Sequence, residues 1–296
     1  MEENFTIRKI TNLELQQVTG WAKSEGFAPG FDDISIYKNI DKEGIWVGCL
    51  ENAPIGSISC VKYNKAYGFI GLFIVKKEFR KKGYGIKLWK HALNYLEDIE
   101  CIGLEAAPMR LKDYQKWGFV TSSITNRWKL NGRKNLPKSN FYNDPRPSFK
   151  VVPGDQISSE AVLNYDSQRE PSPRPHFLND WLKNSIGIVK ALVDDNNMCH
   201  GFGRIRPCML QDNKTGWRIG PLLADTPPLA ELLIRELVGN LENQILLDCP
   251  SLNPYANYLL SNLGFSEISK TYRMYKGAQP PFPMNQVYGL ACLELG

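Results

Sequence analysis

The clearest pattern of apolar and polar positions lies between residues 67 and 96. An uninterrupted apolar run over 67–75 is typical of a buried strand. A polar stretch follows, and apolar residues then return at a spacing of three and four, which predicts a helix with one buried face. The helix positions in question are Ile86, Trp89, Leu93 and Leu96. The pattern therefore predicts a strand and a helix joined by a short polar loop.

The rest of the first half extends this pattern to the order β-α-α-β-β-β-α-β-α-β. The expected strands cover residues 5–10, 44–50, 53–63, 67–75, 101–107 and 120–130. The expected helices cover residues 13–26, 32–41, 86–96 and 111–117. Glu51 and Asn52 separate two apolar runs and predict the turn of a hairpin.

The second half repeats the order of the first. The expected strands cover 149–152, 187–194, 201–206, 217–224 and 244–249, and the expected helices cover 158–165, 176–183, 227–241 and 253–263. Matching positions, such as Gly71 with Gly220 and Gly118 with Gly264, lie roughly 145–150 residues apart, which indicates an internal duplication. The intervening stretch is polar and rich in proline, asparagine and lysine. We therefore expect domains at 1–130 and 149–296, joined by a linker over 131–148.

The loop before the 86–96 helix has the composition of an anion-binding site. It carries five basic residues and two glycines within ten positions: Lys76, Lys77, Arg80, Lys81, Lys82, Gly83 and Gly85. A helix N-terminus offers unpaired N–H groups and a partial positive charge, and glycine lets the backbone approach an anion closely. The P-loop motif is absent, and the dinucleotide fingerprint fails because Leu88 stands at its third glycine. The remaining motif is R-x-x-G-x-G, with a plain basic surface turn as the alternative.

This motif, after a strand that ends in valine, resembles the pyrophosphate-binding loop of the GNAT (GCN5-related) N-acetyltransferases. The predicted order of elements is similar to the GNAT order. The stretches GFAPGFDD from Gly26, RPHFLNDW from Arg174 and RIGPLLAD from Arg218 resemble a bacterial tandem-GNAT family with a divergent second domain. The resemblance implies an α/β (α+β) protein with two tandem GNAT folds, each a mixed central β-sheet flanked by helices.

The resemblance also implies a reaction and its site. Acetyl-CoA is the expected cosubstrate, with its pyrophosphate at the loop and its thioester arm along the end of the central strand. The residues implied in coenzyme binding are Phe73, Ile74, Val75, Arg80, Lys81, Lys82, Gly83, Tyr84 and Gly85. Tyr114, in the sequence Y-x-x-x-G-F, is implied as the proton donor to the leaving thiolate, and a packed structural tyrosine is the alternative.

The group that takes the proton from the attacking amine stays open at this point. Glu25, Asp32, Asp33 and Glu105 are candidates from the residues around the expected site. Asp32 would serve equally well as a helix cap, and Glu105 as a solvated strand end.

The second half departs from the motif that carries the chemistry. Asp225 and two prolines stand in place of the glycine loop, and Leu260 stands at the position of the tyrosine. Asn253 is kept, and it matches an asparagine that many GNAT domains use near the coenzyme. The second domain is expected to be a degenerate, supporting domain that shapes the acceptor pocket. Binding of a separate ligand, or a purely structural role, are the alternatives.

Composition excludes several other classes of protein. The chain has 296 residues, of which 43% are hydrophobic and 23% charged, with a net charge of +5, so we expect a soluble globular protein. No nucleic-acid-binding motif and no membrane-spanning apolar run is found, and the seven scattered cysteines have no metal or disulfide spacing. We expect a cytoplasmic monomer or weak dimer that uses no metal. Its expected reaction is direct attack of a small molecule's primary amine on the thioester, and the alternative is a non-catalytic acyl-CoA-binding sensor or scaffold.

Overall fold

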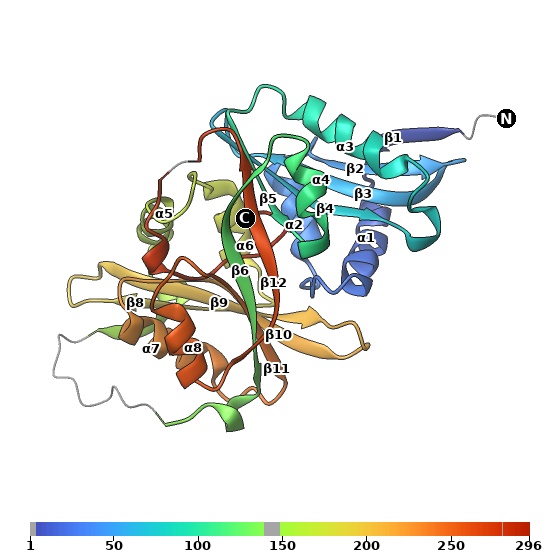
Figure 1. Ribbon diagram of the computed structural model, residues 1–296. Helices are drawn as coiled ribbons and strands as arrows, with labels where there is room; N and C mark the ends of the chain where they lie inside the picture. Colours follow the sequence, from blue (N-terminus) through green and yellow to red (C-terminus); the bar gives the residue numbers. More distant parts are fainter. Residues whose placement is uncertain (1–3, 139–148, 280) are drawn as a thin grey trace.

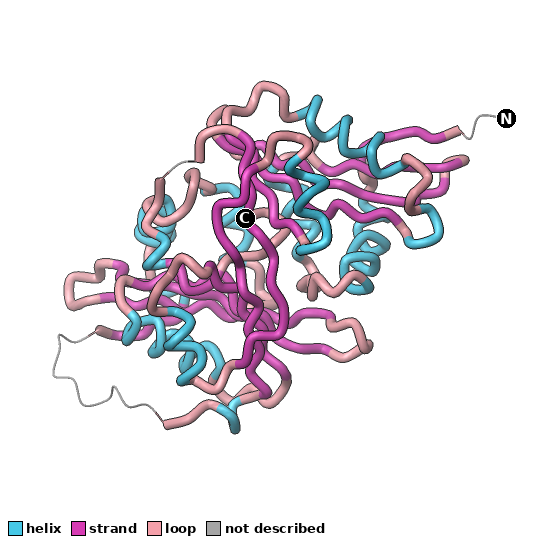
Figure 2. The backbone as a smooth tube through the Cα atoms, viewed as in Figure 1, coloured by secondary structure: helices cyan, strands magenta, loops and turns pink. Residues whose placement is uncertain are grey.

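A single mixed β-sheet runs through both halves of the molecule, with helices packed along it (Figures 1 and 2). The computed structural model describes residues 4–138, 149–279 and 281–296. Within these residues the sheet has thirteen strands, in the order β1-β2-β3-β4-β5-β12-β6-β11-β10-β9-β8-β7, with β13 paired to β10. The predicted class, a mixed sheet flanked by helices, is confirmed.

The first half forms the elements that its apolar pattern predicts. Its strands are β1 (Phe5–Lys9), β2 (Ile45–Leu50), β3 (Ala53–Lys62), β4 (Tyr67–Val75), β5 (Cys101–Ala106) and β6 (Val120–Asn131). Its α-helices are α1 (Asn12–Ser24), α2 (Asp33–Ile40), α3 (Tyr84–Tyr95) and α4 (Leu111–Gln115). Both residues of the predicted hairpin turn, Glu51 and Asn52, have positive φ angles of 48° and 69°. Such a pair joins two antiparallel strands with the least disturbance of their twist.

The second half repeats these elements. Its strands are β7 (Lys150–Pro153), β8 (Ile188–Val193), β9 (Cys199–Met209), β10 (Thr215–Ala224), β11 (Gln244–Pro250), β12 (Ser266–Lys276) and β13 (Val287–Gly289). Its α-helices are α5 (Ser159–Ser167), α6 (Pro175–Lys183), α7 (Pro227–Val238) and α8 (Ala256–Asn262). Strands β12 and β13 were not among the elements that the sequence pattern predicted. Of the expected linker, residues 139–148 lie outside the described residues, and Arg133–Asn135 forms one short 3-10 turn.

One residue of the predicted apolar face of α3 lies elsewhere. The prediction placed Ile86 on the buried side of this helix, but Ile86 is 44% exposed and Leu88 is fully buried instead. Ile86 borders the large cavity described below, so its apolar side chain faces that space rather than the core.

The two halves exchange their last strands. Strand β12, from the second half, pairs with β5 of the first, and β6, from the first half, pairs with β11 of the second. The two exchanged strands also pair with each other, antiparallel, from Val120 to Lys129 of β6. Figure 1 shows them side by side, green and orange-red, where the halves meet.

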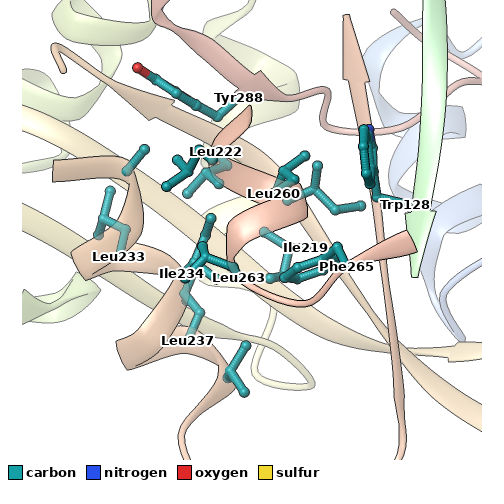
Figure 3. Close-up of a cluster of buried hydrophobic side chains, with 14 of the residues drawn as sticks. Trp128, Ile219, Leu222, Leu233, Ile234, Leu237, Leu260, Leu263, Phe265 and Tyr288 are labelled. Carbon is teal, nitrogen blue, oxygen red and sulfur yellow. The ribbon is translucent and has the colours of Figure 1, made fainter. Parts of the chain in front are cut away.

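Side chains on the exchanged strands complete the hydrophobic core of the opposite half. Trp128 and Leu130 of β6 belong to the core formed by α7, α8, β10 and β11 (Figure 3). Met274 of β12 belongs to the core beneath α3, together with Leu88 and Trp89. Burial of one such aliphatic side chain contributes about 1.5–3 kcal/mol. Each half therefore depends on the other for part of its core.

After β12 the chain returns to the middle of the molecule. Residues 287–296, which we call the closing segment, begin with β13 against β10 and continue to β4 of the first half. Its backbone is held by Tyr63, whose O–H donates to the carbonyl of Leu295 at 3.1 Å. The segment thus contacts the central strand of both halves.

Candidate active site

The central strand of the first half separates from its neighbour in mid-course and opens a cavity. Strand β4 pairs in parallel with β5 from Tyr67 to Ile70 only. Immediately afterwards Leu72 adopts a left-handed backbone with φ of 44°, and the register with β3 shifts. A cavity of about 780 Å³ lies along the separated ends of the two strands. A leucine in this conformation is strained, and strain of this kind concentrates at functional sites.

Most of the predicted coenzyme residues line this cavity. The lining includes Phe73, Ile74, Val75, Arg80, Lys81, Gly83 and Gly85. Lys82 and Tyr84 lie outside it: Lys82 Nζ lies over the ring of Phe79, and Tyr84 is buried against Phe5. The structure therefore brings the strand end and the loop together at one site.

The loop presents the N-terminus of α3 to the cavity. Gly83 is the residue before the helix and has φ of 87°, a conformation that glycine adopts without strain. A Cβ at Gly83 would meet no atom within 4 Å, so the space in front of the helix is open. The N–H groups of the first turn have no acceptor inside the helix and carry the positive end of its dipole. Backbone groups so arranged suit a phosphate.

Arg80 fixes the loop to its surroundings. Its Nε donates to the carbonyl oxygen of Val75 at 2.7 Å, and its Nη2 donates to Oε1 of Glu25 at 2.6 Å. One guanidinium thus joins the end of β4 to the end of α1. This side chain is used mainly to hold the loop in shape.

Tyr114 borders the cavity on helix α4. Its ring packs on Trp89, with 5.1 Å between centroids, and lies 6.4 Å from that of Phe119. Burial raises the pKa of the Tyr114 phenol to about 12. The hydroxyl therefore keeps its proton throughout the neutral range, as a proton donor must.

The four acids weighed as proton acceptors occupy different surroundings. Glu25 lines the cavity and is paired with Arg80. Glu105 also lines it, but accepts hydrogen bonds from Thr125, Thr271 and Arg273. The other two acids lie away from the cavity: Asp33 is buried against Arg206, and Asp32 precedes α2 and accepts from Asn184 at 3.3 Å. Asp32 was predicted to be a catalytic residue together with Tyr114 and Glu25, but the structure places Asp32 outside this cavity.

Sequence reasoning missed a group of buried charges that the second half and the exchanged strand bring to the cavity. Asp248 of β11 accepts from Arg127 of β6 at 2.7 Å and from Arg218 of β10 at 3.1 Å. The same arginines donate to carbonyls of the loop after α1, at Gly26 and Phe27. Burial opposes ionisation of Asp248, but the two arginines outweigh it and hold the Asp248 pKa at about 2. The sequence offered no sign of this group, because its members lie about 100 residues or more apart from the loop they hold.

The corresponding gap in the second half is filled by the chain itself. Strand β10 pairs with β11 from Trp217 to Ile219, and beyond that point β13 pairs with β10 at Leu222 and Leu223. The amide of Asn253 donates to the carbonyl of Val287, and the N–H of Leu290 donates to the carbonyl of Asp248. The closing segment therefore occupies the backbone positions of β10 in the second half. The equivalent positions of β4 in the first half face an open cavity.

The loop position of the second half is also unsuited to an anion. Asp225 accepts from Tyr165 at 2.7 Å and from Arg169 at 2.9 Å, and it lies 2.8 Å from Nδ1 of His200. Leu260, at the position of the tyrosine, is fully buried in the core. The polar groups of this region are therefore hydrogen-bonded to one another within the protein.

The described residues contain no group of three or more histidine, cysteine or acidic side chains able to hold a metal ion, and all seven cysteines are free. None of the described helices is long and apolar enough to cross a membrane.

Comparisons with known proteins agree with this geometry. Residues 9–119 match the acetyltransferase (GNAT) family, and residues 162–289 match an acetyltransferase (GNAT) domain. Holothin acyltransferase from Pseudoalteromonas sp. (strain SANK 73390) is 29% identical over 99% of this chain and 95% of its own length.

Two solved structures resemble the fold over nearly its whole extent. A presumed acetyltransferase of Pyrococcus horikoshii covers 100% of this chain and 97% of its own, with a TM-score of 0.79 and 20% identity. A tandem GNAT protein from the clavulanic acid biosynthesis pathway covers 95% of this chain and 100% of its own, with a TM-score of 0.64 and 12% identity. Two family matches in one chain, one in each half, account for the duplicated elements. The chain belongs to the GNAT acetyltransferases, acyltransferases by activity, and carries two of their domains in tandem.

Proposed function

We infer that this protein transfers an acetyl group from acetyl-CoA to a primary amine of a small molecule, and that the reaction takes place in the first half. The observation that carries the proposal is the open gap beside β4, which meets the N-terminus of α3 at one end and Tyr114 along its side. The equivalent gap of the second half is filled by β13.

The residues of this cavity supply the requirements of the reaction. Backbone N–H groups at Gly83 and in the first turn of α3 bind the pyrophosphate. Main-chain groups at Phe73 to Val75 align the thioester arm. The amine attacks the carbonyl carbon directly, so no covalent enzyme intermediate and no cysteine is required. Tyr114 then gives a proton to the departing thiolate.

The second half shapes the acceptor end of the cavity. Thr271 and Lys270 of β12, Asp248 of β11 and Glu294 of the closing segment all contribute to the lining. Acceptor specificity therefore depends on residues far from the coenzyme loop in the sequence. The relative that resembles this chain over nearly its full length acts on holothin, and we propose holothin as the first acceptor to test.

Calorimetric titration with acetyl-CoA tests the assignment of the coenzyme to the first half. We expect one site per chain, and we expect Gly83→Asp to abolish it, because the new carboxylate would face the pyrophosphate. A second site, or a site that survives the substitution, would assign the coenzyme to the other half. Turnover is followed in parallel by release of free CoA thiol with holothin and a panel of small primary amines. Coenzyme binding without turnover on any amine would support the sensor alternative instead.

A further inference from the structure

Glu294 differs from every other carboxylate that lines the cavity. The other four each have a cationic partner within 3.1 Å: Glu25 with Arg80, Glu105 with Arg273, Asp113 with Arg110 and Asp248 with Arg127. The nearest cation to Glu294 is Arg218, whose Nη1 lies 3.7 Å from Oε1. Among the residues that the structure describes, none donates a hydrogen bond to this oxygen, although Glu294 is only 3% exposed.

A buried carboxylate oxygen without a donor is costly, and proteins rarely keep one without a use. The other oxygen of Glu294, Oε2, receives only a long hydrogen bond of 3.4 Å from the O–H of Tyr37. The other titratable neighbours of Glu294 among the described residues are Arg218 of β10 and the thiol of Cys292. The Tyr37 hydroxyl also lies 3.4 Å from Oδ2 of Asp33, which is paired with Arg206. Within the described part of the chain, Arg218 is the one cation that forms an ion pair with Glu294, at the long distance of 3.7 Å.

The backbone that carries Glu294 is fixed against β4. Gly71 lies beside the carbonyl of Glu294 so closely that a Cβ at Gly71 would overlap it. On either side, Tyr63 donates to the carbonyl of Leu295, and Leu290 donates to the carbonyl of Asp248. The backbone of Glu294, a residue of the cavity lining, is therefore held next to the point where β4 leaves β5.

We propose that Glu294 is the group that accepts the proton of the acceptor amine, so that the closing segment supplies the first half with the proton acceptor that its own residues lack. This inference rests on the function proposed above. An amine that arrives as an ammonium ion fits a carboxylate whose Oε1 receives no hydrogen bond from the described residues, and transfer takes place directly or through one water.

The ammonium gives one proton to Glu294, and the neutral nitrogen attacks the carbonyl carbon of the thioester. As the C–N bond forms and the C–S bond breaks, the nitrogen loses a second proton to water. The thiolate takes a proton from Tyr114, which water then restores, and Glu294 releases its own proton to solvent.

The test compares Glu294→Gln with Glu294→Asp and with Glu236→Gln, an exposed glutamate on α7 that serves as the matched control. Acetyl-CoA affinity is measured by calorimetry, folding by thermal unfolding, and turnover with holothin or the best amine of the panel. We expect Glu294→Gln to bind acetyl-CoA as the wild type does and to lose turnover by about 10²–10⁴-fold. Below the acceptor's own pKa, the residual rate should rise about tenfold per pH unit, because only amine that is already neutral can react. Glu236→Gln should match the wild type in all three measurements.

The outcomes separate this inference from the proposed function. Turnover of Glu294→Gln within about threefold of an active wild type overturns the role of Glu294 and leaves the proposed function standing. A wild type that binds no acetyl-CoA, or acetylates no amine, overturns both. If Glu294→Gln fails to fold, Glu294→Asp decides: reduced turnover with the wild-type pH profile supports the role, and undiminished turnover contradicts it.

Discussion

Gly71 of β4 and Gly220 of β10 hold equivalent positions in the two halves, and both leave room for the backbone of the same closing segment. A Cβ at Gly71 would overlap the carbonyl of Glu294, and a Cβ at Gly220 would overlap the carbonyl of Leu290. In both strands the glycine stands at the end of the parallel pairing with the next strand. The segment therefore passes the two central strands at matching points.

Alanine at either glycine should destabilise the protein without touching the coenzyme loop. The added methyl group has no space, since the atom it meets is backbone, and we expect a loss of about 1–3 kcal/mol in the free energy of unfolding. Gly20→Ala in helix α1 is the control, because a Cβ there meets no atom within 4 Å and alanine favours the helix by about 1 kcal/mol. Urea unfolding measures all three variants. Equal stability of Gly71→Ala and the wild type would contradict the close approach of the segment.

Gly83→Asp should abolish acetyl-CoA binding, since a negative charge at a helix N-terminus repels the pyrophosphate that the dipole attracts. Gly83→Asn is the matched control: asparagine tolerates a positive φ, has nearly the same size and carries no charge. Calorimetry distinguishes the two variants. Loss of binding in both would mean that the backbone, rather than the charge, is responsible, and undiminished binding by Gly83→Asp would remove this loop from the coenzyme site.

Tyr114→Phe should lower kcat by about 10²-fold while the affinity for acetyl-CoA stays near that of the wild type, because only the proton donor is lost and the ring still packs on Trp89. Burial raises the Tyr114 pKa to about 12. At pH values under 10 the phenol therefore keeps its proton, and ionisation of Tyr114 should cause no decline in the wild-type rate. Tyr258→Phe, at a tyrosine that is 72% exposed in the second half, should change neither quantity. Unchanged kcat in Tyr114→Phe would exclude a role in the chemistry.

The Arg127–Asp248–Arg218 group should make stability sensitive to acid. The Asp248 pKa of about 2 in the folded protein lies below the value of about 3.9 expected in the unfolded chain, so the unfolded state binds the proton more readily. The contribution, about 2–3 kcal/mol, is present above pH 4 and is lost as the pH falls towards 2. Between pH 4 and pH 2, the free energy of unfolding of Asp248→Asn should depend less on pH than that of the wild type.

The same substitution should also cost about 3–5 kcal/mol at neutral pH, because two buried arginines lose their counter-charge. Asp155→Asn, at an exposed aspartate, is the control. It should change neither the free energy of unfolding nor the slope of that free energy against pH. An unaltered slope in Asp248→Asn would mean that other carboxylates dominate the acid response.

Helices and strands could be predicted from the sequence where a pattern within a few neighbouring residues determines them. The run from Tyr67 to Val75 is apolar because it is buried in the middle of a sheet, and the glycines at 83 and 85 are local requirements of the turn into α3. These signals predicted the side of the cavity that β4 and the loop before α3 form. Ile86 was misjudged because periodicity registers that a side chain is apolar, and it does not distinguish a core from a cavity wall.

The other side of the cavity, formed by β11, β12 and the closing segment, could not be predicted because it depends on contacts between distant parts of the chain. Strand β12 has mostly exposed residues and little alternation to mark it, and its place beside β5 follows from the sheet as a whole. Glu294 lies near the end of a short apolar stretch that forms no helix and only a three-residue strand. Its meeting with Gly71, more than 200 positions away, has no signature in either local sequence.

The exchange of β6 and β12 makes the covalent connection between the halves less important than the sheet that joins them. A chain cut once between Lys138 and Phe149 would yield two fragments, each holding one strand that the other fragment needs to complete its core. Such fragments should co-purify as a non-covalent pair, whereas either one produced alone would expose the apolar surface that its missing strand covers. We therefore expect the two halves to fold and unfold as one unit rather than as separable modules.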